Sequence, residues 1–274
     1  MSRAPAFERL LKRDRAITLA GLALLCALAG LYTVMGAGLE MSAWDMTTLA
    51  LFPHEQIEGP MPGMDMTWRL TTWPLMIAMW WIMMIAMMTP SATPAILLYA
   101  RVHRQAAAQG QAPENVAPTG AFALGYLLMW LGFAVAATGL HWVLQRAGLV
   151  SAMMMGSQSR WLSGAVLIAA GLYQLSPIKN VCLAHCCSPM SFLMRHWRPR
   201  ASGALRLGAM HGAYCVGCCW MLMALLFVGG VMNLIWIAAL AVLVLIERAL
   251  PAGRWVARAA GVALIGWGVV TLIV

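Results

Sequence analysis

Six of the seven cysteines lie in two short groups that also contain histidine. The first group reads CLAHCC over residues 182–187, and the second reads HGAYCVGCC over residues 211–219. Thiolate sulfur and imidazole nitrogen are ligands that bind Cu⁺, Zn²⁺ and iron–sulfur clusters. The two groups therefore predict a metal or redox centre, and the residue types alone leave the metal open.

The spacing of the second group suits one face of a helix. Residues three and four apart share a helix face. At about 100° per residue, His211, Cys215 and Cys218 fall within an arc of roughly 60°, with Cys219 at its edge. These three residues are candidate ligands, and Cys219 is a weaker candidate.

The first group has the same property if it is helical. Cys182, His185 and Cys186 then form one face, and Cys187 points away from it. We expect this face to meet the face of the second group, because both lie near the same end of consecutive predicted spans. Chance clustering of small apolar residues is the alternative for any one of these cysteines.

Methionine is abundant, at 23 of 274 residues. Thioether sulfur binds Cu⁺ and survives in an oxidising compartment where thiols are lost. An outer Met-rich segment gives the candidate ligands His54, Met61, Met64 and Met66. A second set lies at helical spacing in WPLMIAMWWIMMIAMM, where Met83 and Met87 are candidate ligands and core packing is the alternative.

The composition requires lipid as the solvent for these elements. The chain is 62% hydrophobic and only 10% charged, with a mean hydropathy of +0.78, whereas soluble domains are about 25% charged. We predict an all-α, polytopic bundle forming a single integral membrane domain over 1–274, with an outer loop at 37–72. About seven spans (six to seven) are expected at 16–36, 73–100, 120–145, 160–178, 204–228, 231–247 and 256–274.

The basic residues predict the orientation. In a seven-span arrangement, 15 of the 18 Lys and Arg lie on one face, and the exceptions are Arg69, Arg146 and Arg160. Lys and Arg favour cytoplasmic loops, so the N-terminus is expected in the cytoplasm of a bacterium, with the chain in the inner (plasma) membrane. The net charge of +9 is then topogenic, and no nucleic-acid partner is expected.

Several single residues carry further expectations. Pro90 and Pro94 should kink the second span, and Gly208 with Gly212 forms a G-x-x-x-G that permits close helix approach. His141 should face the bundle interior, as a ligand or as a hydrogen-bonded core residue. Glu247, at the inner end of the sixth span, is expected at a surface.

The two cysteine motifs and MIAMMTP resemble the signatures of a bacterial integral membrane family of predicted metal-binding proteins, a domain of unknown function. The resemblance covers about residues 70–250. It implies a metal centre at six positions and no established reaction, so whether the chain is an enzyme stays open. The implied ligands are Cys182, His185, Cys186, His211, Cys215 and Cys218, and the additional Cys187 and Cys219 leave open which thiols bind.

Copper handling is the leading hypothesis, by uptake facilitation, storage or delivery to a copper enzyme. No nucleotide-binding or phosphorylated-aspartate motif is present to couple energy to transport. One alternative is a membrane oxidoreductase subunit with copper, haem or an iron–sulfur cluster at the cysteines. Another is a structural zinc site in an assembly or scaffold subunit. Expected partners are the lipid bilayer and a further membrane or periplasmic subunit.

Overall fold

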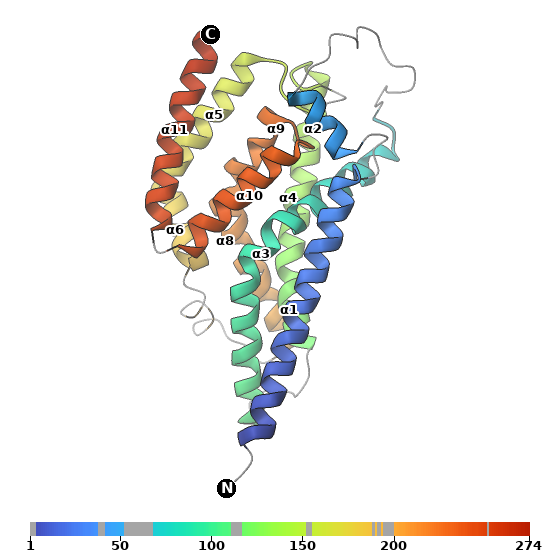
Figure 1. Ribbon diagram of the computed structural model, residues 1–274, viewed down its shortest axis with the longest axis vertical. Helices are drawn as coiled ribbons and strands as arrows, with labels where there is room; N and C mark the ends of the chain where they lie inside the picture. The colour runs from blue at the N-terminus through green and yellow to red at the C-terminus, as the bar shows by residue number, and fades with distance from the viewer. Residues whose placement is uncertain are drawn as a thin grey trace.

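The computed structural model describes residues 4–37, 42–51, 68–110, 117–151, 155–187, 190, 193, 200–250 and 252–274. Throughout this part of the chain the regular elements are α-helices (Figure 1), which confirms the predicted all-α class. The helices are α1 (Ala4–Val34), α2 (Ala43–Leu51), α3 (Thr72–Ala108), α4 (Ala117–Arg146), α5 (Arg160–Leu175), α6 (Pro177–Cys187), α8 (Ala201–Ala224), α9 (Leu226–Gly229), α10 (Leu234–Ala249) and α11 (Gly253–Ile273).

Five of the helical segments are long and apolar enough to cross a membrane, and a bent pair makes a possible sixth. The chain is therefore a multi-pass membrane protein, with five to six candidate spans in the described part of the chain. The sixth predicted span corresponds to α10, whose 16 residues rise about 24 Å, less than a hydrocarbon core of about 30 Å. The two ends of the chain lie at opposite ends of the bundle (Figure 1), and the cytoplasmic N-terminus remains a prediction.

The fourth predicted span is broken where a continuous helix was expected. Helices α5 and α6 meet at an angle of 64°. Ser176, between them, is extended with φ −70° and ψ 148°, because the proline that follows disfavours a helical conformation at the preceding residue. The bend turns α6, which carries the first cysteine group, away from the direction of α5.

Helices α4 and α8 pack with their backbones almost in contact. A Cβ atom on Gly208 would lie 1.9 Å from the carbonyl oxygen of Phe122, and one on Gly125 would lie 2.1 Å from that of Leu205. Only glycine fits at either position. The expected close approach at Gly208 is confirmed, and it fixes the height of α8 against α4.

Methionines of α3 form much of the bundle core. The helix continues through Pro90 and Pro94. The buried methionines of its core face are Met76, Met79, Met83, Met84, Met87 and Met88, each at most 4% exposed. Large apolar side chains on the outer surfaces of α1 and α11, such as Leu28 and Val262, are more than half exposed, as lipid-facing positions require.

Candidate metal centre

Three cysteines of α8 lie on its buried face. Cys215, Cys218 and Cys219 are all buried, and the thiols of Cys218 and Cys219 both donate to the carbonyl oxygen of Cys215, at 3.2 and 2.9 Å. These bonds back to the helix hold the sulfurs on one side. The predicted helical face of this motif is therefore the face that packs into the bundle.

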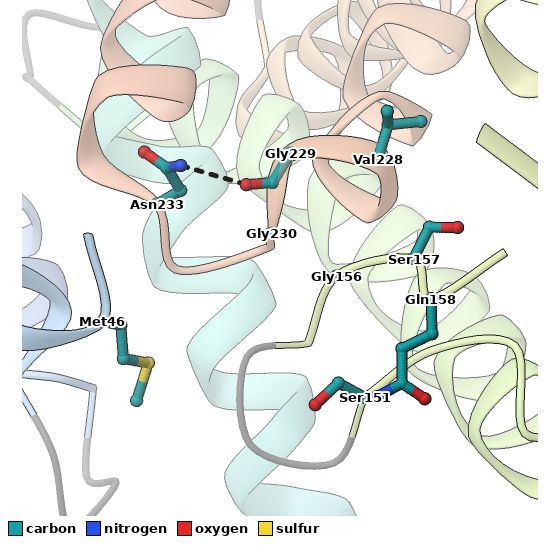
Figure 2. Close-up of a pocket in the computed structure, with 9 residues that line it drawn as sticks. All are labelled: Met46, Ser151, Gly156, Ser157, Gln158, Val228, Gly229, Gly230 and Asn233. Atoms are coloured by element: carbon teal, nitrogen blue, oxygen red, sulfur yellow. Dashed lines mark hydrogen bonds between the residues drawn. The ribbon is translucent and has the colours of Figure 1, made fainter. Parts of the chain in front are cut away.

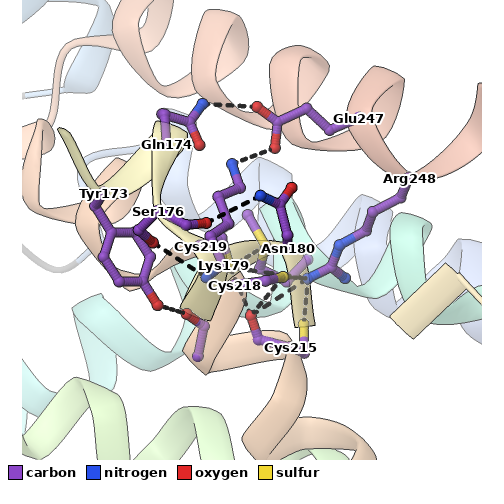
Figure 3. A network of polar contacts seen from close by, with 12 residues as sticks. Tyr173, Gln174, Ser176, Lys179, Asn180, Cys215, Cys218, Cys219, Glu247 and Arg248 are labelled. Carbon is purple, nitrogen blue, oxygen red and sulfur yellow. Dashed lines mark hydrogen bonds and ion pairs between the residues drawn. The ribbon is translucent and has the colours of Figure 1, made fainter. Parts of the chain in front are cut away.

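A guanidinium group of α10 lies among these thiols (Figure 3). The Nη2 atom of Arg248 is 3.0 Å from Sγ of Cys215 and 3.0 Å from Sγ of Cys218, and it also donates to the Cys215 carbonyl oxygen at 3.3 Å. Its Nη1 atom donates to Ser91 Oγ on α3 at 2.8 Å. A positive charge held this close to two sulfurs stabilises negative charge at that point.

Helices α3 and α4 close the other side of the centre. The Tyr126 hydroxyl is 3.1 Å from Cys215 Sγ and 3.1 Å from the Met88 carbonyl oxygen, to which it donates. The thioether sulfur of Met88 lies 4.0 Å from Cys219 Sγ. The methionine-rich core of α3 thus reaches the cysteine centre directly.

Helix α6 brings the first cysteine group to the same place. Cys186 is hydrogen-bonded to Cys218. The Cys182 sulfur lies 3.2 Å from the position that a Cβ on Gly217 would take, so the glycine makes room for it. The two cysteine groups meet, as their spacing predicted.

The histidines of the two motifs behave differently from the cysteines. His185 is exposed, stacks on the Tyr214 ring at 4.5 Å, and its Nδ1 bonds to the Val181 carbonyl of its own helix. His211 is buried one turn before Cys215 and packs against the rings of Phe122 and Tyr126. Only His211 therefore lies in the interior with the thiols.

A buried ion pair ties α6 to α10 beside the centre. Lys179 Nζ donates to Glu247 Oε2 at 2.6 Å, and Gln174 Nε2 donates to Glu247 Oε1 at 2.7 Å (Figure 3). Lys179 and Glu247 are 1% and 2% exposed. The expectation that Glu247 lies at a surface was wrong, because α6 folds over it after the bend and supplies its counter-charge.

No group of three Cys, His, Asp or Glu side chains that could hold a metal ion occurs among the described residues. The thiols converge on Arg248 instead. A structural Zn²⁺ site normally takes four ligands, more than these residues gather at one point. His54, Met61, Met64, Met66 and the side chain of Cys187 lie outside the described residues, while Met83 and Met87 are buried in the α3 core.

Sequence reasoning missed the residues that surround the thiols. Arg248 was counted as a topogenic charge, and Tyr126 and Lys179 drew no functional expectation. The one available signal was the adjacent pair Glu247 and Arg248, which stands in an otherwise apolar stretch where charged residues are costly. The hydrogen-bond partners described above lie from 30 to 157 residues away along the chain, so spacing rules give no access to them.

Of two pockets among the described residues, one borders this framework and the other lies apart from it. One, of about 310 Å³, is lined by Asn180, Glu247, Arg248 and Arg254, so Arg248 separates it from the thiols. The other, of about 270 Å³, lies where Met46 of α2, Ser151 with residues 156–158, and residues 228–233 meet (Figure 2). Its described lining has one thioether and no thiol, imidazole or carboxylate, so it is a poor candidate for a metal site.

Comparisons with known proteins address identity. A family model described as PpoB2, copper chaperone, matches residues 77–271, a range that includes both cysteine groups, most of α3 and the Arg248 contact. No curated protein and no solved structure matches the chain. Membership of this family implies copper binding. The expected class, metal-binding membrane proteins, is thereby narrowed to membrane proteins that handle copper. The chain belongs to the PpoB2 family of copper chaperones.

Proposed function

We propose that the centre formed by α6, α8 and α10 holds Cu⁺ through cysteine thiolates and passes it on. Cys215 and Cys218 are the principal ligands, and Cys186 and Cys182 of α6 are further candidates beside them. The observation that carries the proposal is the single guanidinium nitrogen of Arg248, 3.0 Å from both Cys215 and Cys218 Sγ. Cys219 and His211, on the same face of α8, are secondary candidate ligands.

Charge explains why an arginine belongs beside a copper ligand set. Cu⁺ held by two thiolates is an anion, and an anion buried in a membrane bundle needs a nearby positive charge. Arg248 supplies that charge whether the thiolates hold copper or not. A guanidinium also makes several directed hydrogen bonds and stays protonated, so the thiolates remain available for a soft metal ion.

The buried methionines of α3 give copper a route to this centre. From Met76 to Met88 the helix rises about 18 Å, and Met88 ends 4.0 Å from Cys219 Sγ. Thioethers bind Cu⁺ reversibly, so Met83 and Met87 serve as intermediate ligands. In this proposal the outer residues His54, Met61, Met64 and Met66 capture copper first. With no energy-coupling motif in the sequence, the protein facilitates, stores or delivers the ion.

Copper binding by purified full-length protein in detergent tests the centre. The variant changes Cys182, Cys186, Cys215 and Cys218 to Ser, and anaerobic Cu⁺ titration follows the ultraviolet absorption of copper–thiolate bonds. We expect the wild-type protein to develop this absorption and the variant to lack it. Cys26→Ser is the matched control, because Cys26 lies on α1 and is expected to leave the absorption unchanged.

Metal content measured on the same samples completes the test. We expect the quadruple variant to lose its thiol-bound copper while the fold, followed by circular dichroism, is retained. Equal copper content and equal absorption in wild type and quadruple variant would refute the proposed centre.

A further inference from the structure

His141 of α4 is a buried imidazole that lacks hydrogen-bond partners. It is 0% exposed, and neither ring nitrogen has a partner in the described part of the chain. Its neighbours include the rings of Trp68 and Phe227, both edge-on at 5.8 Å between centroids. The expectation that His141 faces the interior is confirmed, but no hydrogen bond of a core histidine accompanies it.

Other polar atoms near His141 share this condition. The hydroxyl of Thr138, one turn earlier on the same face of α4, is buried without a partner, and so is the indole nitrogen of Trp80 on α3. Trp80 contacts the Phe227 ring at 5.2 Å, and Phe227 contacts His141. Buried polar groups are nearly always satisfied, so the two unpartnered ring nitrogens of His141, with the Thr138 hydroxyl one turn away, point to a bound ion or water.

Contacts between the helices show which side chains lie level with His141. On α3 and α4, Met88 meets Tyr126 near one end and Trp73 meets Trp142 near the other. This antiparallel register places Met76 within about a turn of Thr138 and His141.

Helix α8 supplies a second methionine at the same level. Gly208 lies against Phe122 and Gly212 against Tyr126, so α8 runs parallel to α4 and Met223 lies level with Ala137 and Thr138. Met223 and Met76 are both fully buried. Two thioethers from different helices therefore share the level of the unpartnered imidazole.

We propose that His141, Met76 and Met223 form a second Cu⁺ site, at the opposite end of the α3 methionine core from the cysteine centre. The proposal rests on the copper-handling function proposed above. His141 lies 15 residues beyond Tyr126 on α4, about 22 Å along the helix axis, so the two sites are distinct. Imidazole and thioether are neutral ligands that suit Cu⁺. Transfer to the cysteines is ligand exchange, in which copper keeps its oxidation state.

The direct test removes the stronger centre first. In a full-length Cys215→Ser, Cys218→Ser background, we expect residual Cu⁺ binding with a nitrogen ligand in the copper X-ray absorption spectrum. Adding His141→Gln should abolish the nitrogen signal and reduce the residual copper. Met76→Leu and Met223→Leu should each weaken binding while preserving side-chain volume. His103→Gln changes a different buried histidine, which lies on α3, and should have no effect.

The outcomes separate this proposal from the first one. Residual copper that survives His141→Gln with its spectrum unchanged would overturn the second site, as would a background that binds no copper. If a trapped water occupies the site in place of copper, the background will likewise bind no copper. If the Cys215 and Cys218 changes instead leave the thiolate absorption of the wild type intact, the cysteine centre fails and the His141 site is judged separately by its nitrogen signal.

Discussion

The cysteine centre and the His141 site differ in how their polar atoms are satisfied. At the centre, Arg248 and Tyr126 contact the thiols, and the Lys179–Glu247 pair lies alongside. At His141, both ring nitrogens and the Thr138 hydroxyl lack partners among the described residues. Thiolates carry charge and need counter-charge before any metal binds, whereas imidazole and thioether are neutral. The contrast indicates that the cysteine centre is organised around anionic thiolates, whereas the polar atoms at the His141 site gain a partner only when an ion binds.

The largest effect is expected from breaking the ion pair beside the cysteine centre. Lys179→Met leaves Glu247 buried without its cation, and removing one partner of a buried pair costs about 3–5 kcal/mol. We expect the free energy of unfolding, measured by denaturant titration in detergent, to fall by that order. The double variant Lys179→Met, Glu247→Gln should recover most of the loss. A single variant as stable as the wild type would show that the pair does not hold α6 against α10.

Removing the Arg248 guanidinium should weaken copper binding at the cysteine centre. It should destabilise the His141 end of the bundle much less. Groups that contact metal ligands typically change metal affinity by about 10- to 100-fold when removed, and we expect Arg248→Met to fall in this range. Arg248→Lys keeps the charge and should be intermediate. Competition with a Cu⁺-specific chromophoric chelator measures the affinity. Arg254→Met, in the adjacent pocket, is the control, and an equal loss there would reduce the Arg248 effect to general electrostatics.

His141→Phe should sharpen the contrast between the two sites. Without copper, replacing an unsatisfied buried imidazole by an apolar ring is expected to leave the protein equally stable or up to about 1 kcal/mol more stable. With Cu⁺ present, the wild type alone gains stability from binding at this site. Thermal unfolding with and without Cu⁺ measures both effects. A destabilised copper-free variant would indicate that His141 has a structural role instead.

The smallest effect is expected at Tyr126. Tyr126→Phe removes one hydroxyl that contacts Cys215 Sγ and the Met88 carbonyl. Because a single hydrogen bond contributes about 1 kcal/mol, copper affinity should fall only a few-fold, with the ultraviolet thiolate absorption retained. Loss of that absorption would mean that the hydroxyl does more than orient the Cys215 sulfur.

The sequence predicted the parts of this architecture that follow from local spacing. The buried face of α8 follows from the three- and four-residue intervals among His211, Cys215 and Cys218. The close approach at Gly208 follows from its G-x-x-x-G. The apolar stretches located most of the helices, although α10 is shorter than a span and α5 is cut off from α6 at Pro177, a residue visible in the sequence but not used.

The rest of the site depends on tertiary contacts that no spacing rule contains. Arg248 reaches Cys215 across 33 positions and Tyr126 reaches it across 89. The same charge pattern that predicts orientation also concealed Arg248 and Lys179, because a basic residue near the end of a span is usually topogenic. His185 lies outside the interior because α6 is at the edge of the bundle, where the His185 ring stacks on Tyr214 of α8 and stays exposed.

X-ray absorption at the copper edge, on full-length wild-type protein loaded with one equivalent of Cu⁺, tests the central claim most directly. The account predicts an all-sulfur first shell that is replaced, when Cys215 and Cys218 are both changed to Ser, by the mixed shell of the His141 site, with one nitrogen and thioether sulfur. A wild-type shell without sulfur, or an all-sulfur shell unchanged in the double variant, would contradict it.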